Sequence, residues 1–381
     1  MARLTAHSHC PDGYGPPLRQ RGVALIASLA VLAIAVTTAT GIAYQVHLNM
    51  RRAQNVVGSE RAWQYAFSAE KAAMAILARD SENSDIDYRE AGIETEPWFT
   101  KQPVVRQLPG NTELMFAVTD LQARFNLNIV DGSGPSDSAQ GEGGEEESGS
   151  LGPALDQFER LMSRASVPTD GESVATALAD WIDSDRKVRF PGGAEDDHYS
   201  RLDVPHRAAN TAMVSPTEIK RIKGLEGDSL RPFWNALCPH VTALPDDAAA
   251  VNVNTASAEV LASLAASVQM DDAEQAVAQR EDNAYSSVDD FLERNRAFNV
   301  PELANNRLAV ASEYFLLHAR ISRPRSQFHL YSVIHRPAGS NADGGPRVIR
   351  RSRVPPHLMG GRDDASDGEQ AQPCIGARLN F

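Results

Sequence analysis

Residues 23–46, VALIASLAVLAIAVTTATGIAYQV, form a run of 24 residues without a charged side chain. A helix of this length crosses a hydrocarbon core of about 30 Å. Arg19 and Arg21 stand just before the run, so the positive-inside rule leaves residues 1–22 in the cytoplasm and carries the following chain across the membrane. The pattern predicts a single-pass anchor with the bulk of the chain on the far side.

The composition excludes several other classes of protein. With 42% hydrophobic and 23% charged residues the chain is neither a multi-span membrane protein nor wholly disordered. Its net charge of −13 argues against non-specific nucleic-acid binding, which needs cations to neutralise phosphates. Cys10, Cys238 and Cys374 have no CxxC spacing, which excludes a zinc ribbon. Whether Cys238 and Cys374 pair stays open.

The junction before the apolar run has its own pattern. Residues 20–26, QRGVALI, resemble the processing site of type IV pilin-like proteins. That resemblance implies that prepilin peptidase removes residues 1–22 by cutting between Gly22 and Val23, and that the new amino group is methylated. The residues alone leave a plain signal anchor open. A secretory signal peptide is disfavoured because no A-x-A-like site ends the run.

The fifth residue after this junction departs from the common pilin pattern. Most members of the pilin-like family carry Glu there, whereas this chain has Ala27. In the family that Glu pairs with the free amine of a neighbouring subunit, and a buried unpaired charge is costly. A subunit without the acid suits the tip position, where no amine lies ahead. Its absence is typical of the K-type minor pseudopilins of type II secretion systems.

The chain beyond the anchor alternates between helical and strand patterns. Apolar residues at three- and four-residue steps predict that the helix continues from Val23 to about Leu77, with a stop over residues 79–83. Strand patterns follow in four places: residues 112–120, 314–321, 327–334 and 347–352. The predicted fold class is α+β, with a pilin-like long N-terminal helix on a small antiparallel sheet and a large all-α inserted domain.

These patterns divide the chain into segments. Residues 131–152 are rich in Gly, Ser and Glu and predict a disordered acidic linker. The full division is a leader (1–22), a transmembrane and stem helix (23–80), a first pilin-like α/β half (81–130), the linker (131–152), the inserted helical domain (153–305), a second sheet half (306–355) and a flexible C-terminal tail (356–381).

Within the inserted domain, carboxylates crowd one Gly-containing loop. Such a group repels itself unless a cation or an arginine neutralises it, and calcium prefers flexible carboxylate oxygens. The spacing is not that of an EF-hand, and an exposed acidic loop balanced by nearby basic residues is the alternative. The candidate metal ligands are Asp183, Asp185, Glu195, Asp196 and Asp197. Calcium is the candidate cofactor, and the K-family resemblance of residues 180–185 and 193–199 supports it.

An internal repeat raises an alternative function. Asn210-Thr211-Ala212 and Asn254-Thr255-Ala256 each precede a Ser-capped short helix, and both units resemble helix-hairpin-helix or SAM-like repeats. A membrane-anchored DNA-binding protein would use glycine-rich hairpins to bind phosphate. Here acidic residues flank the first hairpin, and the second has lost its glycines. We therefore predict no nucleic-acid partner. A calcium-dependent hydrolase is a third alternative, but none of the common hydrolase motifs is present.

The resemblances converge on the K-type minor pseudopilins and cover most of residues 20–352. They are strongest at the leader junction, at Phe125-Asn126-Leu127-Asn128, in the acidic loop and over residues 251–264. The resemblance implies a non-enzymatic inner-membrane protein with its bulk in the periplasm, at the tip of a pseudopilus for protein export. It further implies that minor pseudopilins of the I and J types, the major pseudopilin and prepilin peptidase are its partners.

Overall fold

The computed structural model describes most of the chain: residues 20–91, 94–99, 103–131, 152–225, 230–245, 250–303, 307–324, 326–337 and 345–353. The chain divides into two compact units, with the boundary between Arg61 and Ala62. Predictions about the leader before residue 20, the acidic linker and the C-terminal tail lie outside the described residues. So do Cys10, Cys374 and residues 226–229, which include Gly227 in the hairpin of the first repeat.

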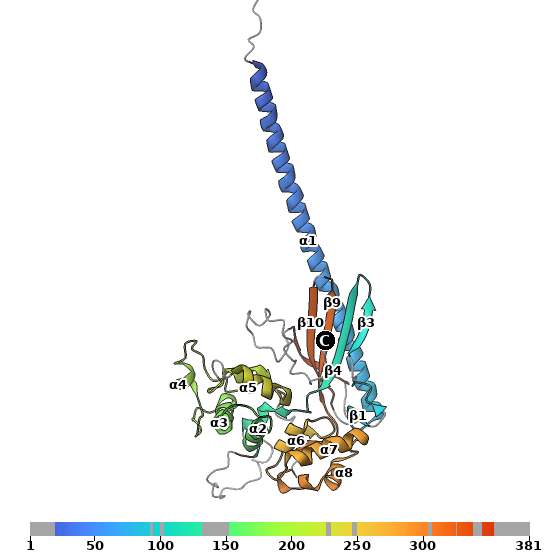
Figure 1. The fold of residues 1–381 in the computed structure, drawn as a ribbon, viewed down its shortest axis with the longest axis vertical. Coiled ribbons are helices and arrows are strands. Elements are labelled where there is room, and N and C mark those ends of the chain that lie inside the picture. The colour runs from blue at the N-terminus through green and yellow to red at the C-terminus, as the bar shows by residue number, and fades with distance from the viewer. Residues whose placement is uncertain are drawn as a thin grey trace, which may run out of the picture. The chain divides into compact units, whose positions relative to one another are not determined.

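The first unit is the N-terminal part of α1 (Gln20–Asn83), a continuous helix of 64 residues (Figure 1). Threonines inside the apolar run bond back to the helix: Thr38 Oγ1 donates to the carbonyl of Ile34 at 2.9 Å, which satisfies the hydroxyl in an apolar surrounding. The helix was expected to end near Leu77. It continues to Asn83, whose side-chain amide donates to the carbonyl of Arg79.

In the second unit, the C-terminal part of α1 packs on a five-stranded antiparallel sheet with the order β11-β10-β9-β4-β3 (Figure 1). Small side chains on α1 allow a close approach to apolar residues of the sheet, and the shared core contains Ala62, Ala66, Ala69, Ala73, Leu77, Phe116, Phe315, Leu317, Ile321 and Leu330. The strands are β3 (Val104–Leu108), β4 (Thr112–Asp120), β9 (Tyr314–Arg323), β10 (Ser326–His335) and β11 (Arg347–Ser352).

All four predicted strands are present in this sheet. The expected range 112–120 matches β4, while β9 and β10 are slightly longer than expected. The edge strand β3 was not predicted, because Val104–Leu108 is short and its middle residues are exposed. A small hairpin of β1 (Glu90–Ala91) and β2 (Glu94–Thr95) precedes β3.

Glu70 interrupts the apolar stripe of α1, and the structure explains how it is accommodated. The side chain is 3% exposed. Its carboxylate accepts hydrogen bonds from Ser332 of β10 at 2.7 Å and from Arg351 of β11 at 2.8 Å through each oxygen. The buried acid thus holds two strands against the helix, since a carboxylate with several donors is stable inside a protein.

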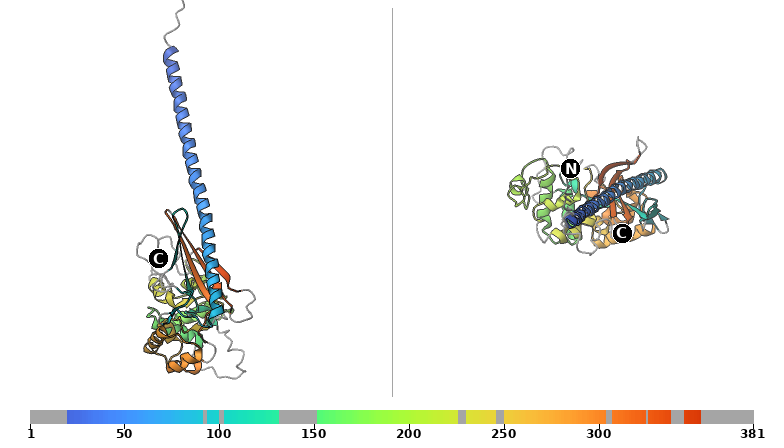
Figure 2. Two further views of the ribbon diagram at one scale, coloured as in Figure 1. Left: turned by 90° about the vertical axis from the view of Figure 1, so that its right-hand side faces the viewer. Right: turned by 90° about the horizontal axis from the view of Figure 1, so that it is seen from above.

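The inserted region is a bundle of short helices with its own core (Figure 2). Phe125, Leu127 and Val130, from the segment before the linker, also lie in this core. Its helices are α2 (Pro153–Arg164), α3 (Gly171–Ile182), α4 (Asp196–Tyr199), α5 (Leu230–Leu237), α6 (Ala258–Ser263), α7 (Met270–Asp282) and α8 (Val288–Arg294).

Short strands and 3-10 helices connect these helices to the rest of the chain. Two parallel strand pairs, β5 with β6 and β7 with β8, join this bundle to neighbouring segments. The ranges are β5 (Phe125–Asn126), β6 (Val241–Thr242), β7 (Val251–Asn252), β8 (Leu308–Ala309), η1 (Leu127–Asp131), η2 (Pro216–Arg221), η4 (Cys238–His240), η5 (Arg296–Phe298) and η6 (Pro301–Leu303).

The two repeats differ in their helices. Ser215 and Glu218 form a capping box, but the turn that follows is the 3-10 helix η2. In the second repeat Ser257 caps α6, and α7 follows after a short connection. The Ser caps are confirmed, while the helix-hairpin-helix assignment stays a prediction. Cys238 is buried and disulfide-bonded.

Candidate functional site

The apolar surface of α1 is the first candidate site. The stretch from Val23 to Asn83 contains an 18-residue window with a mean hydropathy of 2.3, and none of that window is buried. Val23 and Ile26 are each about two-thirds exposed, at 67% and 68%. An apolar surface of this extent is normally covered by lipid or by other helices. This helix is therefore a candidate single membrane anchor.

The predicted processing residues lie at the start of that helix. Gly22 and Val23 belong to its first turns, and Ala27 is exposed one turn further along. The helix therefore presents a methyl group where most pilin-like proteins have a carboxylate. Cleavage between Gly22 and Val23 stays a prediction.

The acidic loop of the inserted region is the second candidate site. Asp183 ends α3, where its backbone N–H donates to the carbonyl of Ala179. Its Oδ1 accepts a hydrogen bond from the backbone N–H of Asp185 at 3.3 Å. This turn places the carboxylates of Asp183 and Asp185 together just after the end of α3. Glu195 stands on the far side of the loop as the N-cap of α4.

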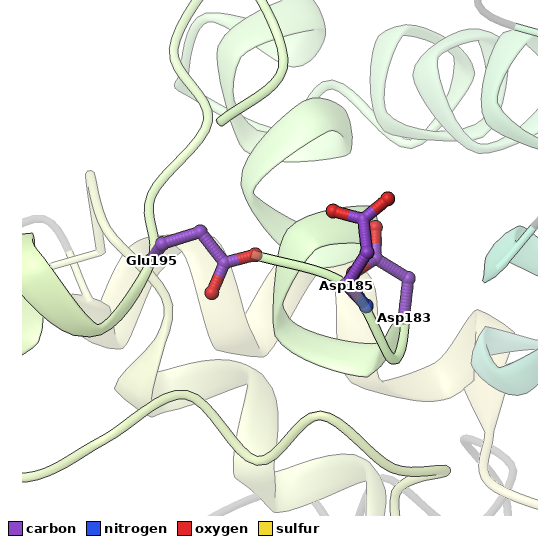
Figure 3. A group of neighbouring side chains, drawn as sticks. All are labelled: Asp183, Asp185 and Glu195. Carbon is purple, nitrogen blue, oxygen red and sulfur yellow. Dashed lines mark hydrogen bonds between the residues drawn. The ribbon is translucent and has the colours of Figure 1, made fainter. Parts of the chain in front are cut away.

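Three of the five predicted ligands converge. One carboxylate oxygen each of Asp183, Asp185 and Glu195 lies within 4.8 Å of the others. Figure 3 shows the Glu195 carboxylate pointing across the loop toward the two aspartates. Oxygens bound 2.3–2.6 Å from one calcium ion are separated by roughly this much or less. A single hard cation can therefore contact all three carboxylates.

The other two predicted ligands lie apart from this group of three. Asp196 Oδ1 accepts a hydrogen bond from the backbone of Ala208 at 3.1 Å. Asp197 is exposed on α4. Their neighbour Tyr199 packs edge-on against Trp181 of α3, with ring centroids 5.1 Å apart. This contact fixes α4 beside α3 and so sets the position of Glu195.

The surroundings of Glu195 favour a bound cation. It is only 4% exposed, yet neither carboxylate oxygen has a hydrogen-bond partner. Burial raises the pKa of Glu195 to about 7, and the negative charges of Asp180 and Asp183 contribute. A buried carboxylate without donors is unfavourable. A divalent cation would satisfy both oxygens, and the all-oxygen donor set suits calcium.

Glycine is required where the loop closes. A Cβ added at Gly193 would lie under 3.0 Å from the carboxylate of Asp180 and from the backbone of Arg189. One at Gly192 would approach Ser173 at under 3.0 Å, and its φ of +88° also favours glycine. The close packing brings the two sides of the loop together around the acids.

Two further groups at this loop were not predicted as site residues. Asp180 is fully buried, burial raises its pKa to about 6, and it accepts hydrogen bonds from the backbone of Arg189. Asn210 donates to the carbonyl of Asp185 at 2.9 Å while its own buried Oδ1 has no partner. Its φ of +46° is left-handed, a conformation that asparagine tolerates. Asn210 was noticed in the sequence only as part of the internal repeat. Its position beside Asp185 is evident only in the folded structure.

A different group of buried acids lies where α1, the sheet and the inserted helices meet. Arg336 Nη1 donates to Asp80 at the end of α1 at 2.9 Å, and Nη2 contacts Asp87 and the carbonyl of Ser312. Burial raises the pKa of Asp87 to about 6, although the charge of Arg336 opposes the rise. The guanidinium therefore pairs with acids from two segments of the chain.

Asp120, at the end of β4, extends this network into the inserted region. Its Oδ2 accepts from Thr255 and from Ser312, while Oδ1 accepts from the backbone of Gln122 at 2.8 Å. Glu96 is buried beside Asp80, and burial together with a hydrogen bond to Asp80 raises the pKa of Glu96 to about 9. Glu96 is thus neutral at pH 7, which reduces repulsion in the network.

Comparisons with known proteins match this architecture. Residues 123–246 and 251–311 match two models of the family described as type II secretion system protein K. A protein K from Pectobacterium carotovorum is 31% identical over 327 residues, covering 83% of this chain and 93% of the relative. One from Pseudomonas aeruginosa is 29% identical, covering 87% and 92%.

A solved structure extends the likeness to the fold. A chain in the crystal structure of the GspK-GspI-GspJ complex from enterotoxigenic Escherichia coli superposes with a TM-score of 0.63 at 25% identity. The match covers 80% of this chain and 99% of that chain. The DNA-binding alternative finds no support among these relatives. Because the identity to the Pectobacterium relative extends over most of both chains, this chain belongs to the type II secretion system protein K family, the K-type minor pseudopilins.

Proposed function

We propose that this chain is the tip subunit of a short periplasmic pseudopilus, where it initiates or caps assembly for protein export across the outer membrane. The match to nearly the whole length of a chain in the GspK-GspI-GspJ complex carries this proposal. The inserted helical region adds a steric reason, because a subunit widened by a second core obstructs the stacking of another subunit above it.

The N-terminus supports the same position. Cleavage between Gly22 and Val23 by prepilin peptidase, followed by methylation, would leave the apolar helix on the mature protein. Ala27 offers no carboxylate to the amine of a subunit ahead, and such an amine would be buried without a partner. The subunit therefore accepts neighbours behind it but none in front.

The partners follow from the exposed face of α1. Its apolar side chains need lipid before assembly and neighbouring helices afterwards, since packing between such helices replaces contacts with lipid. The neighbours we propose are the I- and J-type minor pseudopilins and, behind them, the major pseudopilin. The location is the inner membrane, with the bulk of the chain in the periplasm.

The acidic loop supplies a structural cation site in this proposal. Asp183, Asp185 and Glu195 are the proposed ligands, with Asn210 a neighbouring oxygen donor. Calcium would neutralise the mutual repulsion of the acids and close the loop between α3 and α4. We assign these carboxylates no catalytic role, so the chain acts by binding other proteins and not as an enzyme.

The processing step is tested by the intact mass and N-terminal sequence of the protein extracted from its native membrane. The proposal predicts a chain that begins at Val23 with an N-methyl group. Retention of residues 1–22 would indicate a signal anchor instead. Cleavage after residue 46 would indicate a secretory signal peptide, and either result would contradict assembly into a pseudopilus.

A further inference from the structure

Arg189 lies at the centre of the acidic loop. Its Nη2 is 3.0 Å from Asp183 Oδ2, and its Nε is 3.8 Å from Asp180 Oδ1. The side chain is one-third exposed, while both aspartates are buried. The guanidinium therefore covers the acids from the solvent side and supplies positive charge to them.

The contact uses an atom that the proposed metal ion also needs. Asp183 Oδ1 already accepts the backbone N–H of Asp185. The other oxygen, Oδ2, is buried and faces the Arg189 guanidinium, so a cation bound by this oxygen meets the arginine. Two cations on one carboxylate oxygen repel each other strongly where solvent is largely excluded. Arginine and metal ion thus compete for the same position.

The backbone around Arg189 is held independently of its side chain. Its N–H donates to Asp180 Oδ2 at 3.1 Å, and its carbonyl accepts from the backbone of Gly193 at 3.0 Å. Neither bond involves the guanidinium. The side chain can therefore leave Asp183 for the solvent without unfolding the loop.

We propose that Arg189 is a built-in counter-cation, which occupies Asp183 in the metal-free protein and is displaced into solvent when a divalent cation binds. This inference rests on the cation site proposed above. The exchange lowers the cation affinity, because binding must first break the ion pair. It also exposes a positive charge between Val188 and Phe190, which are already 60% and 91% exposed. Binding of a cation therefore changes the charge that the outer surface of the loop presents to solvent.

A chemical labelling experiment tests the displacement directly. The detergent-solubilised full chain is treated with phenylglyoxal, with and without saturating calcium, and the modified arginines are quantified by peptide mass spectrometry. We expect calcium to increase labelling of Arg189 several-fold. Arg186, exposed on the same loop, is the internal control and should not change. Unchanged or reduced labelling of Arg189 at a saturated site would overturn the proposal.

A substitution tests the competition by calorimetric calcium titration. Arg189→Gln removes the competing charge and should bind calcium about tenfold more tightly than the wild type, within the usual range of coupling between two ligands of one site. Arg186→Gln is the matched control and should bind as the wild type does. Equal or weaker binding by Arg189→Gln would contradict the inference.

The titration also separates the two proposals. If the wild type and Arg189→Gln both fail to bind calcium, the cation site itself is wrong, and the Arg189 inference falls with it. If the wild type binds and Arg189→Gln gains no affinity, the cation site stands and only the counter-cation role is refuted.

Discussion

Around Arg336 the buried carboxylates of Asp80 and Asp87 contact a guanidinium from the same chain, whereas Glu195 is buried with neither oxygen hydrogen-bonded. The side chains of Asp80, Asp87 and Glu195 are buried to a similar degree. Asp80 and Asp87 have the positive charge of Arg336 beside them, and the neighbouring Glu96 is protonated and so adds no negative charge. The group around Glu195 has one partly exposed arginine at its rim.

This difference distinguishes a structural network from a ligand site. Buried charges persist when hydrogen bonds and counter-charges satisfy them. At the junction Asp80 and Asp87 each already accept a hydrogen bond from Arg336, so an added ion gains less there even though Asp87 Oδ1 has no hydrogen-bond partner. A group that remains under-satisfied gains considerably, so the loop and not the junction is where a cation should bind.

The largest effect is expected at the junction. Arg336→Met leaves Asp80 and Asp87 buried without their counter-charge, and we expect the free energy of unfolding to fall by about 3–5 kcal/mol. Chemical denaturation of the detergent-solubilised chain measures it. Arg347→Met, at an exposed position of β11, is the control. A loss below about 1 kcal/mol, or full recovery on adding calcium, would remove the distinction between the two groups.

The next effect concerns the loop. Calcium at 100 times its dissociation constant should stabilise the wild type by about 2.7 kcal/mol, because it binds the folded state alone. Glu195→Gln should lose this gain, since the amide cannot supply a charged ligand. Melting curves with calcium and with chelator measure both. Equal stabilisation of the variant would exclude Glu195 as a ligand.

A smaller effect is the pH dependence of the junction. Glu96 titrates near 4.5 when unfolded, and its pKa rises to about 9 in the fold. The stability contributed by its neutral form is therefore complete below pH 4.5 and is lost as the pH rises through 9. Glu96→Gln should flatten the decline in denaturation midpoint between pH 5 and pH 9. Parallel slopes in the two proteins would show that Glu96 is not held neutral.

The smallest effect separates neighbouring acids within the loop. Asp197→Asn should leave calcium affinity within about twofold of the wild type, because Asp197 is exposed and outside the group of three. Asp185→Asn should lower it by at least about tenfold, as expected for a ligand. A similar loss of calcium affinity in both variants would show that Asp197 is also a ligand.

Much of the fold could be predicted from local patterns. The uncharged run at residues 23–46 and the apolar steps beyond it indicate one long helix, which the structure extends to Asn83. Strand-forming sequence patterns predicted β4 and β9–β11. The edge strand β3 was missed because an exposed strand of five residues has little apolar pattern to read.

The sites were less accessible to sequence reasoning. Closeness in sequence suggested five carboxylates, but the turns after α3 and the direction of α4 bring three together. The pairing of Asp80 with Arg336 joins residues 256 positions apart, and Asp120 reaches Thr255 across the inserted region. No local pattern reports such contacts, since they depend on how separate segments pack.

The central claim is the tip position, and immunogold labelling of isolated pseudopili tests it most directly. An epitope placed in the C-terminal segment after residue 353 should bind gold at one end of each filament and nowhere along its length. Labelling at intervals along the filament would contradict the account, because it would show that subunits stack in front of this one.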